Sequence, residues 1–343
     1  ELYSGGGLDG FNPEDIQGVV IDVMKCVGKL RESYSQLVEL FEPVQNKADT
    51  EEIELFLADE KKRAGFYDRL CCFGRDLATV LNSERAYSAF ENDKAEIAKY
   101  KSAFVFYSKV RRSVKIRYAD SIDNREYEAQ MQNLLDKYMS VEGIRNITNP
   151  VDILDREGMA RELQELGSER SKADAIAAHL TKSIKEKHDE NPAYYESFSK
   201  RIKDALEAYK NRVITETEYL DRMKAIMKDY REGNSNISYP EKIKNDIHAQ
   251  AFYGVIAAVL DDVVDISANI DVISDLSLEI TKIIRKHDTV DWQTNTDIHN
   301  KIAQDIDDLF YKFEKENGFK VGFDVIDKII ENIVIVALKR FGR

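Results

Sequence analysis

Apolar residues return every three or four positions along most of this chain, which is the spacing of one face of an α-helix. The pattern is clearest over residues 30–41, 127–138, 195–209, 219–230, 298–313 and 323–341. Each stripe predicts an amphipathic helix whose apolar face packs into a core. The sequence shows no long alternation of apolar and polar residues, although the short run at residues 18–21 fits either a strand or a buried helix.

Several helix ends are marked by residues that satisfy free backbone groups or stop the helix. Asn191 followed by Pro192 predicts a capped helix start with proline in the first turn. Thr215 with Glu218 three residues later predicts a capping box. Pro43 predicts the end of the first helix.

The composition agrees with a helical fold, because the 343 residues include only 16 glycines and 5 prolines and are 43% hydrophobic. We therefore predict an all-α protein with a linker at 1–13 and a bundle-like helical domain over 14–232. A Gly/Asn/Ser-rich linker at 233–239 then leads to a second helical unit over 240–343. Because the chain begins at Glu1 without an initiator methionine, we expect it to be a piece of a longer protein.

Cysteine usage and hydropathy restrict the compartment. The three cysteines include an adjacent pair, Cys71 and Cys72, and give no disulfide framework. No apolar run approaches the roughly 18 residues that a membrane span needs. We expect a reducing, cytoplasmic setting without membrane contact.

Charge is distributed unevenly along the chain. The net charge is −13, which argues against broad coating of nucleic acid. Residues 97–119 nevertheless carry seven bases and no acid, whereas residues 234–308 carry six bases and 14 acids. The two stretches therefore suit partners of opposite charge.

The basic stretch is the candidate binding site. Its central cations are Lys109, Arg111, Arg112, Lys115 and Arg117, and aromatic residues are interleaved with them. Cations with aromatic rings suit a phosphate backbone or a stacked base, so one hypothesis is contact with nucleic acid. Two alternatives stay open: an ordinary helix with a basic face and an aromatic core face, or contact with an acidic protein segment such as 234–308.

Sequence motifs for catalysis are missing or incomplete. Gly5 and Gly10 have the spacing of a phosphate loop, but the Lys-Ser/Thr that should follow is absent. The acidic triplet Asp261, Asp262 and Asp265 suits Mg²⁺ in a small-molecule enzyme, but it has no matching second cluster. The histidines are scattered without zinc spacing. We predict no catalytic residue, cofactor site or metal site in this chain.

Several segments resemble the C-terminal helical region of the restriction and motor (R) subunit of type I restriction enzymes. They are FLADEKKRAGFYDRL (56–70), FYSKVRRSVKIRYADSIDNREYEAQMQNLLDKYM (106–139), NPVDILDREGMARELQEL (149–166), NPAYYESFSKRI (191–202) and VDWQTNTDIHNKIAQDIDDLF (290–310). The resemblance extends from about Leu2 to Phe319, and none of these segments is a catalytic signature.

The resemblance implies a parent subunit with a nuclease domain and two helicase domains that uses ATP and Mg²⁺ as a site-specific deoxyribonuclease and translocase. It further implies that this chain follows the second helicase domain, braces the motor and docks on the modification and specificity subunits of a methyltransferase. DNA is then a possible partner in the full complex. A nucleic-acid-contacting helical module using 97–119 is the alternative function.

Overall fold

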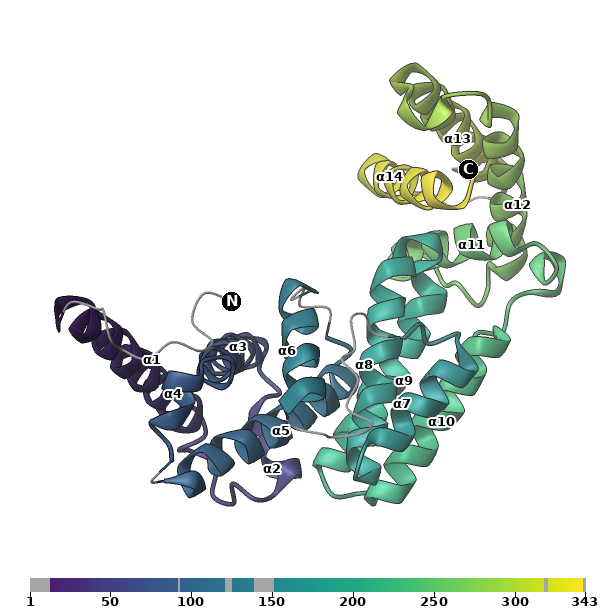
Figure 1. The fold of residues 1–343 in the computed structure, drawn as a ribbon. Coiled ribbons are helices and arrows are strands. Elements are labelled where there is room, and N and C mark those ends of the chain that lie inside the picture. Colours follow the sequence, from purple (N-terminus) through teal and green to yellow (C-terminus); the bar gives the residue numbers. More distant parts are fainter. Residues whose placement is uncertain (1–12, 92, 121–124, 139–150, 318–319, 342–343) are drawn as a thin grey trace. The chain divides into compact units, whose positions relative to one another are not determined.

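The computed structural model describes residues 13–91, 93–120, 125–138, 151–317 and 320–341. Within these ranges all regular elements are helical, and no strand occurs (Figure 1). The all-α prediction is therefore confirmed, and the ambiguous run at residues 18–21 lies in a helix. The predicted linker at 1–13 and the loop between Gly5 and Gly10 lie outside the described residues, apart from Pro13, which begins the first helix.

The chain divides into two compact units, Glu1–Ala175 and Ile176–Arg343. The helices of the first unit are α1 (Pro13–Glu39), α2 (Thr50–Phe56), α3 (Glu60–Asn82), α4 (Glu84–Ser88), α5 (Lys94–Arg117), α6 (Arg125–Tyr138) and α7 (Arg156–Glu165). Helix α8 (Glu169–Lys187) contains the division. The second unit continues with α9 (Pro192–Lys210), α10 (Glu216–Glu232), α11 (Ile247–Leu260), α12 (Ile270–His287), α13 (Thr296–Asn317) and α14 (Phe323–Arg340).

The first unit is built around an aromatic core shared by α1, α3, α5 and α6. Phe41, Phe66 and Phe73 are fully buried there, and the ring of Tyr107 stacks on Phe41 at 5.4 Å between centroids. Gly74 lets α3 approach α5, because a Cβ at this position would lie 2.7 Å from the Phe104 ring. The aromatic residues of the basic stretch therefore face this core.

The second unit has its own core, formed mainly by α11 to α14. Helix α9 also packs against α11 through Gly254, where a Cβ would lie 2.6 Å from the Cβ of Ala193. Residues 192–210 thus share a unit with residues 247–340, and the linker predicted at 233–239 lies within that unit. Gly233, with φ of +74°, ends α10 in a left-handed turn there.

The predicted helix starts are confirmed. The Asn191 side chain accepts a hydrogen bond from the backbone N–H of Tyr194 at 3.2 Å, and Pro192 is the first residue of α9. Thr215 and Glu218 form the capping box of α10: the Thr215 hydroxyl accepts from the Glu218 N–H at 3.2 Å, and the Thr215 N–H donates to the Glu218 carboxylate at 2.7 Å. Local sequence signals therefore place these two helices correctly.

Candidate functional site

The five predicted cations lie on α5 in different surroundings. Arg111 and Lys115 are each 2% exposed and Arg117 is 0% exposed, whereas Arg112 is half-buried and Lys109 is exposed. Buried side chains do not reach a phosphate backbone, so the predicted nucleic-acid contact is wrong for Arg111, Lys115 and Arg117. It stays a prediction for the bases at the surface of this helix.

Arg117 is the centre of a buried charge cluster. Its Nη1 donates to Glu54 Oε2 at 2.9 Å, and its Nη2 donates to Glu51 Oε1 at 2.8 Å and to Asp174 Oδ2 at 2.7 Å. The two glutamates are three residues apart on α2, so that short helix presents both to α5. Asp174 comes from α8. One guanidinium therefore ties three helices together.

The surroundings keep this arginine charged. Burial opposes the charged form, but the hydrogen bond to Glu51 and the charge of Asp174 outweigh burial and hold the pKa of Arg117 above its usual value. Burial raises the pKa of Glu54, which Ser113 and Arg117 oppose by donating hydrogen bonds to its carboxylate. The Ser168 hydroxyl donates to the remaining oxygen of Glu51 at 2.7 Å. The cluster is thus enclosed by polar partners on several sides.

A second buried ion pair closes the end of α5. Ala119 adopts a left-handed conformation with φ of +47°, and the backbone N–H of Asp120 bonds to the carbonyl of Lys115 at 3.0 Å. This turn brings Asp120 to Arg63 of α3, whose Nε donates to Oδ2 at 2.8 Å. The Tyr67 hydroxyl donates to the same oxygen at 3.2 Å. Sequence reasoning missed Asp120, although it directly follows the basic stretch.

Helix α7 contributes a third contact to α5. Arg112 forms a two-pronged ion pair with Glu165. Glu162, one turn earlier on α7, is only 5% exposed. Burial raises the pKa of Glu162 to about 7, against the opposing effect of a hydrogen bond from the backbone of Val151. The junction therefore contains a carboxyl group that titrates near neutral pH.

Replacing Glu162 with glutamine is expected to stabilise the protein by about 1 kcal/mol at pH 8 and to change stability little at pH 5. The folded-state pKa lies above the ordinary value of 4.5, so the native carboxyl holds its proton between the two values and stability falls as pH rises through that window. Glutamine removes this loss of stability because its side chain is uncharged over the whole pH range. Urea unfolding of both proteins at the two pH values measures the effect.

Glu157→Gln is the matched control, because Glu157 is an exposed acid on the same helix. Its substitution should leave the pH dependence of stability unchanged. Equal pH dependence in wild type and Glu162→Gln would contradict the assignment of this carboxyl.

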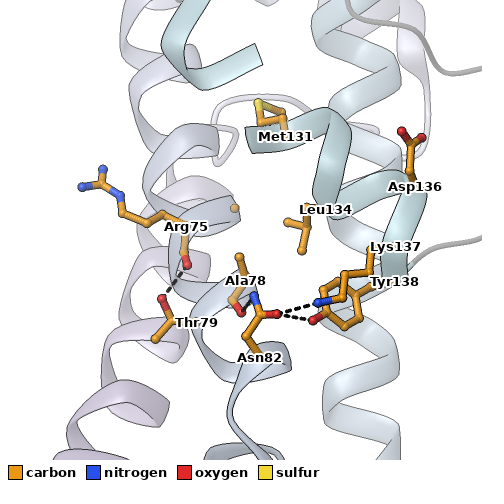
Figure 2. A pocket seen from close by; sticks show the side chains of 10 residues that line it. Arg75, Ala78, Thr79, Asn82, Met131, Leu134, Asp136, Lys137 and Tyr138 are labelled. Carbon is orange, nitrogen blue, oxygen red and sulfur yellow. Dashed lines mark hydrogen bonds between the residues drawn. The ribbon is translucent and has the colours of Figure 1, made fainter. Parts of the chain in front are cut away.

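The first unit contains a groove of about 690 Å³ between α3 and α6 (Figure 2). The polar side chains that line the groove form hydrogen bonds with one another. Asn82 Oδ1 accepts from Lys137 Nζ at 3.0 Å and from the Tyr138 hydroxyl. Met131 and Leu134 form its apolar wall. These contacts fasten the end of α3 to α6.

The acidic triplet does not form a cluster that holds a metal. Asp261 is the C-cap residue of α11, and the Asp265 side chain accepts from the backbone N–H of Ala268 at 3.2 Å. Among the described residues, no group of three His, Cys, Asp or Glu side chains is placed to bind a metal ion. The same part of the chain holds no helix with the length and apolar character of a membrane span. Cys26, Cys71 and Cys72 are free thiols.

These features define an all-helical region whose most distinctive chemistry is buried ion pairing. The family described as "Type I restriction enzyme HindI endonuclease subunit-like, C-terminal" matches residues 17–335, so the chain belongs to that family. The resemblance seen in the sequence is thereby confirmed.

A curated relative gives the scale of the match. The chain is 24% identical over 217 residues to the type I restriction enzyme HindI endonuclease subunit of Haemophilus influenzae, covering 61% of this chain and 20% of that protein. The chain thus spans about a fifth of the length of that relative. No solved structure matches the chain.

Proposed function

We propose that this chain is a non-catalytic assembly region of an ATP-dependent type I restriction endonuclease subunit. It braces the helicase motor and docks the subunit on the modification and specificity subunits of the methyltransferase, in the cytoplasm. ATP, Mg²⁺ and DNA cleavage then belong to the nuclease and helicase domains of the parent subunit. The family match over residues 17–335 supports the general role.

The docking role is supported by one observation, the exposed acids from the end of α11 to the middle of α13. Nine aspartates are exposed there: Asp261, Asp262, Asp265, Asp271, Asp288, Asp291, Asp297, Asp307 and Asp308. The nearby bases are largely engaged within the unit, since Lys286 bonds to Asp305 at 2.9 Å and Lys242 to Asp275 at 2.9 Å. Exposed acids in this number favour association with a basic protein surface rather than with DNA.

Neutralising four of these acids in the full-length subunit tests the docking role. The variant Asp262→Asn/Asp297→Asn/Asp307→Asn/Asp308→Asn is expected to lower affinity for the methyltransferase about tenfold or more at low salt, because it removes long-range attraction. Added salt should weaken the wild-type complex in the same way. DNA-stimulated ATP hydrolysis by the isolated subunit should stay unchanged.

The control removes four exposed acids from α9 and α10 of the same unit: Glu196→Gln/Asp204→Asn/Glu207→Gln/Asp221→Asn. Both variants lose four negative charges. A difference in their affinity for the methyltransferase therefore depends on where the acids lie and not on net charge. Equal affinity of wild type and the first variant would overturn docking through this segment.

A further inference from the structure

The end of α14 is held by residues that are distant in sequence. Arg340 Nη1 donates to the backbone carbonyl of Glu190 at 2.9 Å, in the 3₁₀ helix His188–Glu190. Arg340 Nε donates to His248 Nδ1, in the first turn of α11, at 3.3 Å. One guanidinium therefore bonds α14 to both the start of α11 and the segment that precedes α9.

This hydrogen bond fixes the protonation state of the histidine. A guanidinium carries donors only, so His248 Nδ1 must be the acceptor and must lack a proton. The imidazole is then neutral, with its hydrogen on Nε2. The ring also lies 4.3 Å from the Phe341 ring, centroid to centroid, at an angle of 32°. Of these two contacts, the hydrogen bond from Arg340 requires the neutral form of His248.

Protonation of His248 is incompatible with this arrangement. A second hydrogen on Nδ1 would face the Arg340 Nε–H, so the hydrogen bond would become a contact between two cations. The hydrogen bond that is lost belongs to Arg340, which also bonds to the backbone carbonyl of Glu190. Protonation therefore weakens the attachment of the whole end of α14.

The surroundings of His248 as a whole lower its pKa and so favour the neutral form. Burial is the largest influence that lowers the pKa of His248, followed by the charge of Arg340 and, more weakly, Arg285 of α12. Asp246, the N-cap of α11, opposes them but also accepts from the backbone N–H of His248 and stands 3.5 Å from Arg285.

The cavity beside the ring, about 770 Å³, is lined by further charges of both signs: Glu190, Asp288 and Lys339. Helix α9 contributes Tyr195, whose hydroxyl interacts with Arg340. The charged groups of the 3₁₀ helix Glu241–Ile243 are engaged elsewhere, since Lys242 bonds to Asp275 at 2.9 Å and Lys244 pairs with Glu241 at 3.2 Å. These neighbours do not supply a carboxylate bonded to the ring.

We propose that His248 and Arg340 form a proton-controlled latch, which holds the C-terminal end of α14 against α11 and the 3₁₀ helix His188–Glu190 while His248 is neutral and releases it when His248 is protonated. The latch is independent of the proposed docking function. Its release frees Arg340 and Phe341, which follow the buried residues Val336 and Ala337 of α14, and leaves the core of the second unit in place.

Amide hydrogen exchange of residues 339–341, corrected for intrinsic chemical rates, tests the latch in the full chain. Protection of this segment relative to residues 273–284 of α12 is expected to fall roughly threefold or more between pH 7.5 and pH 5.5, because the released state binds the His248 proton more readily than the held state does. His248→Gln, which keeps an acceptor for Arg340 but cannot become charged, should keep its protection at pH 5.5.

His188→Gln is the matched control, because His188 is exposed and pairs with Asp189 rather than with Arg340. It should lose protection in acid as the wild type does. An acid response that persists in His248→Gln, or that is absent from the wild type, overturns the latch.

The glutamine of His248→Gln could fail to bind Arg340 even at pH 7.5. In that case an NMR titration of the wild-type His248 ring still tests the latch. The wild-type midpoint should fall below the ordinary histidine value of 6.5 and should rise in Arg340→Gln, in which the neighbouring cation is removed. A midpoint that is the same in both proteins would contradict the proposal.

Discussion

Replacing Arg117 with methionine is expected to lower the free energy of unfolding of the first unit by about 3–5 kcal/mol. Methionine fills similar apolar volume but supplies no donors, so Glu51, Glu54 and Asp174 are left facing one another without a cation. Uncompensated buried charge is among the most destabilising results of a single substitution. Urea unfolding followed by circular dichroism measures the change.

Lys109→Met provides the control for this substitution. Lys109 lies on the same helix but is exposed, so its loss should change stability by no more than about 0.5 kcal/mol. The single tryptophan, Trp292, lies in the second unit and is 2% exposed, so its fluorescence reports that unit separately. Similar unfolding midpoints for the two variants would show that the cluster does not stabilise the first unit.

A second substitution should rescue part of the loss. Glu54 is the most buried of the three acids, and burial raises its pKa. Glu54→Gln in the Arg117→Met background removes one unpaired charge, so the double variant is expected to be more stable than Arg117→Met alone. Together with the wild type and the Glu54→Gln single variant, these two proteins complete a double-mutant cycle that isolates the coupling of this pair.

The basic stretch illustrates what the sequence could and could not predict. One of the interpretations that the sequence left open, a helix with an aromatic core face, is present in α5. The partners of its cations do not follow from spacing, because Glu51, Glu54 and Asp174 are 57 to 66 residues away from Arg117. A run of like charge indicates a solvated face only when no other element supplies opposite charge on folding.

The division of the chain into two units also depends on contacts between residues that are distant in the sequence. Glycine, asparagine and proline near residues 233–240 correctly indicate an interruption between helices, and Gly233 provides it. The contact of Gly254 with Ala193, 61 positions apart in the sequence, decides which helices share a core. Periodicity also assigned Phe323 to a buried stripe, but as the first residue of α14 it is 82% exposed.

Replacing Gly254 with valine is expected to lower the free energy of unfolding of the second unit by about 2 kcal/mol, despite the higher helix propensity of valine. The added Cβ would lie 2.6 Å from the Cβ of Ala193, so α9 and α11 must move apart. The Trp292 fluorescence transition in urea should shift to lower concentration. Ala258→Val, which adds the same β-branched side chain at an exposed position of α11, should shift it little. Equal midpoints for the two valine variants would mean that α9 does not pack on α11, and the boundary at 233–239 expected from the sequence would then be the correct one.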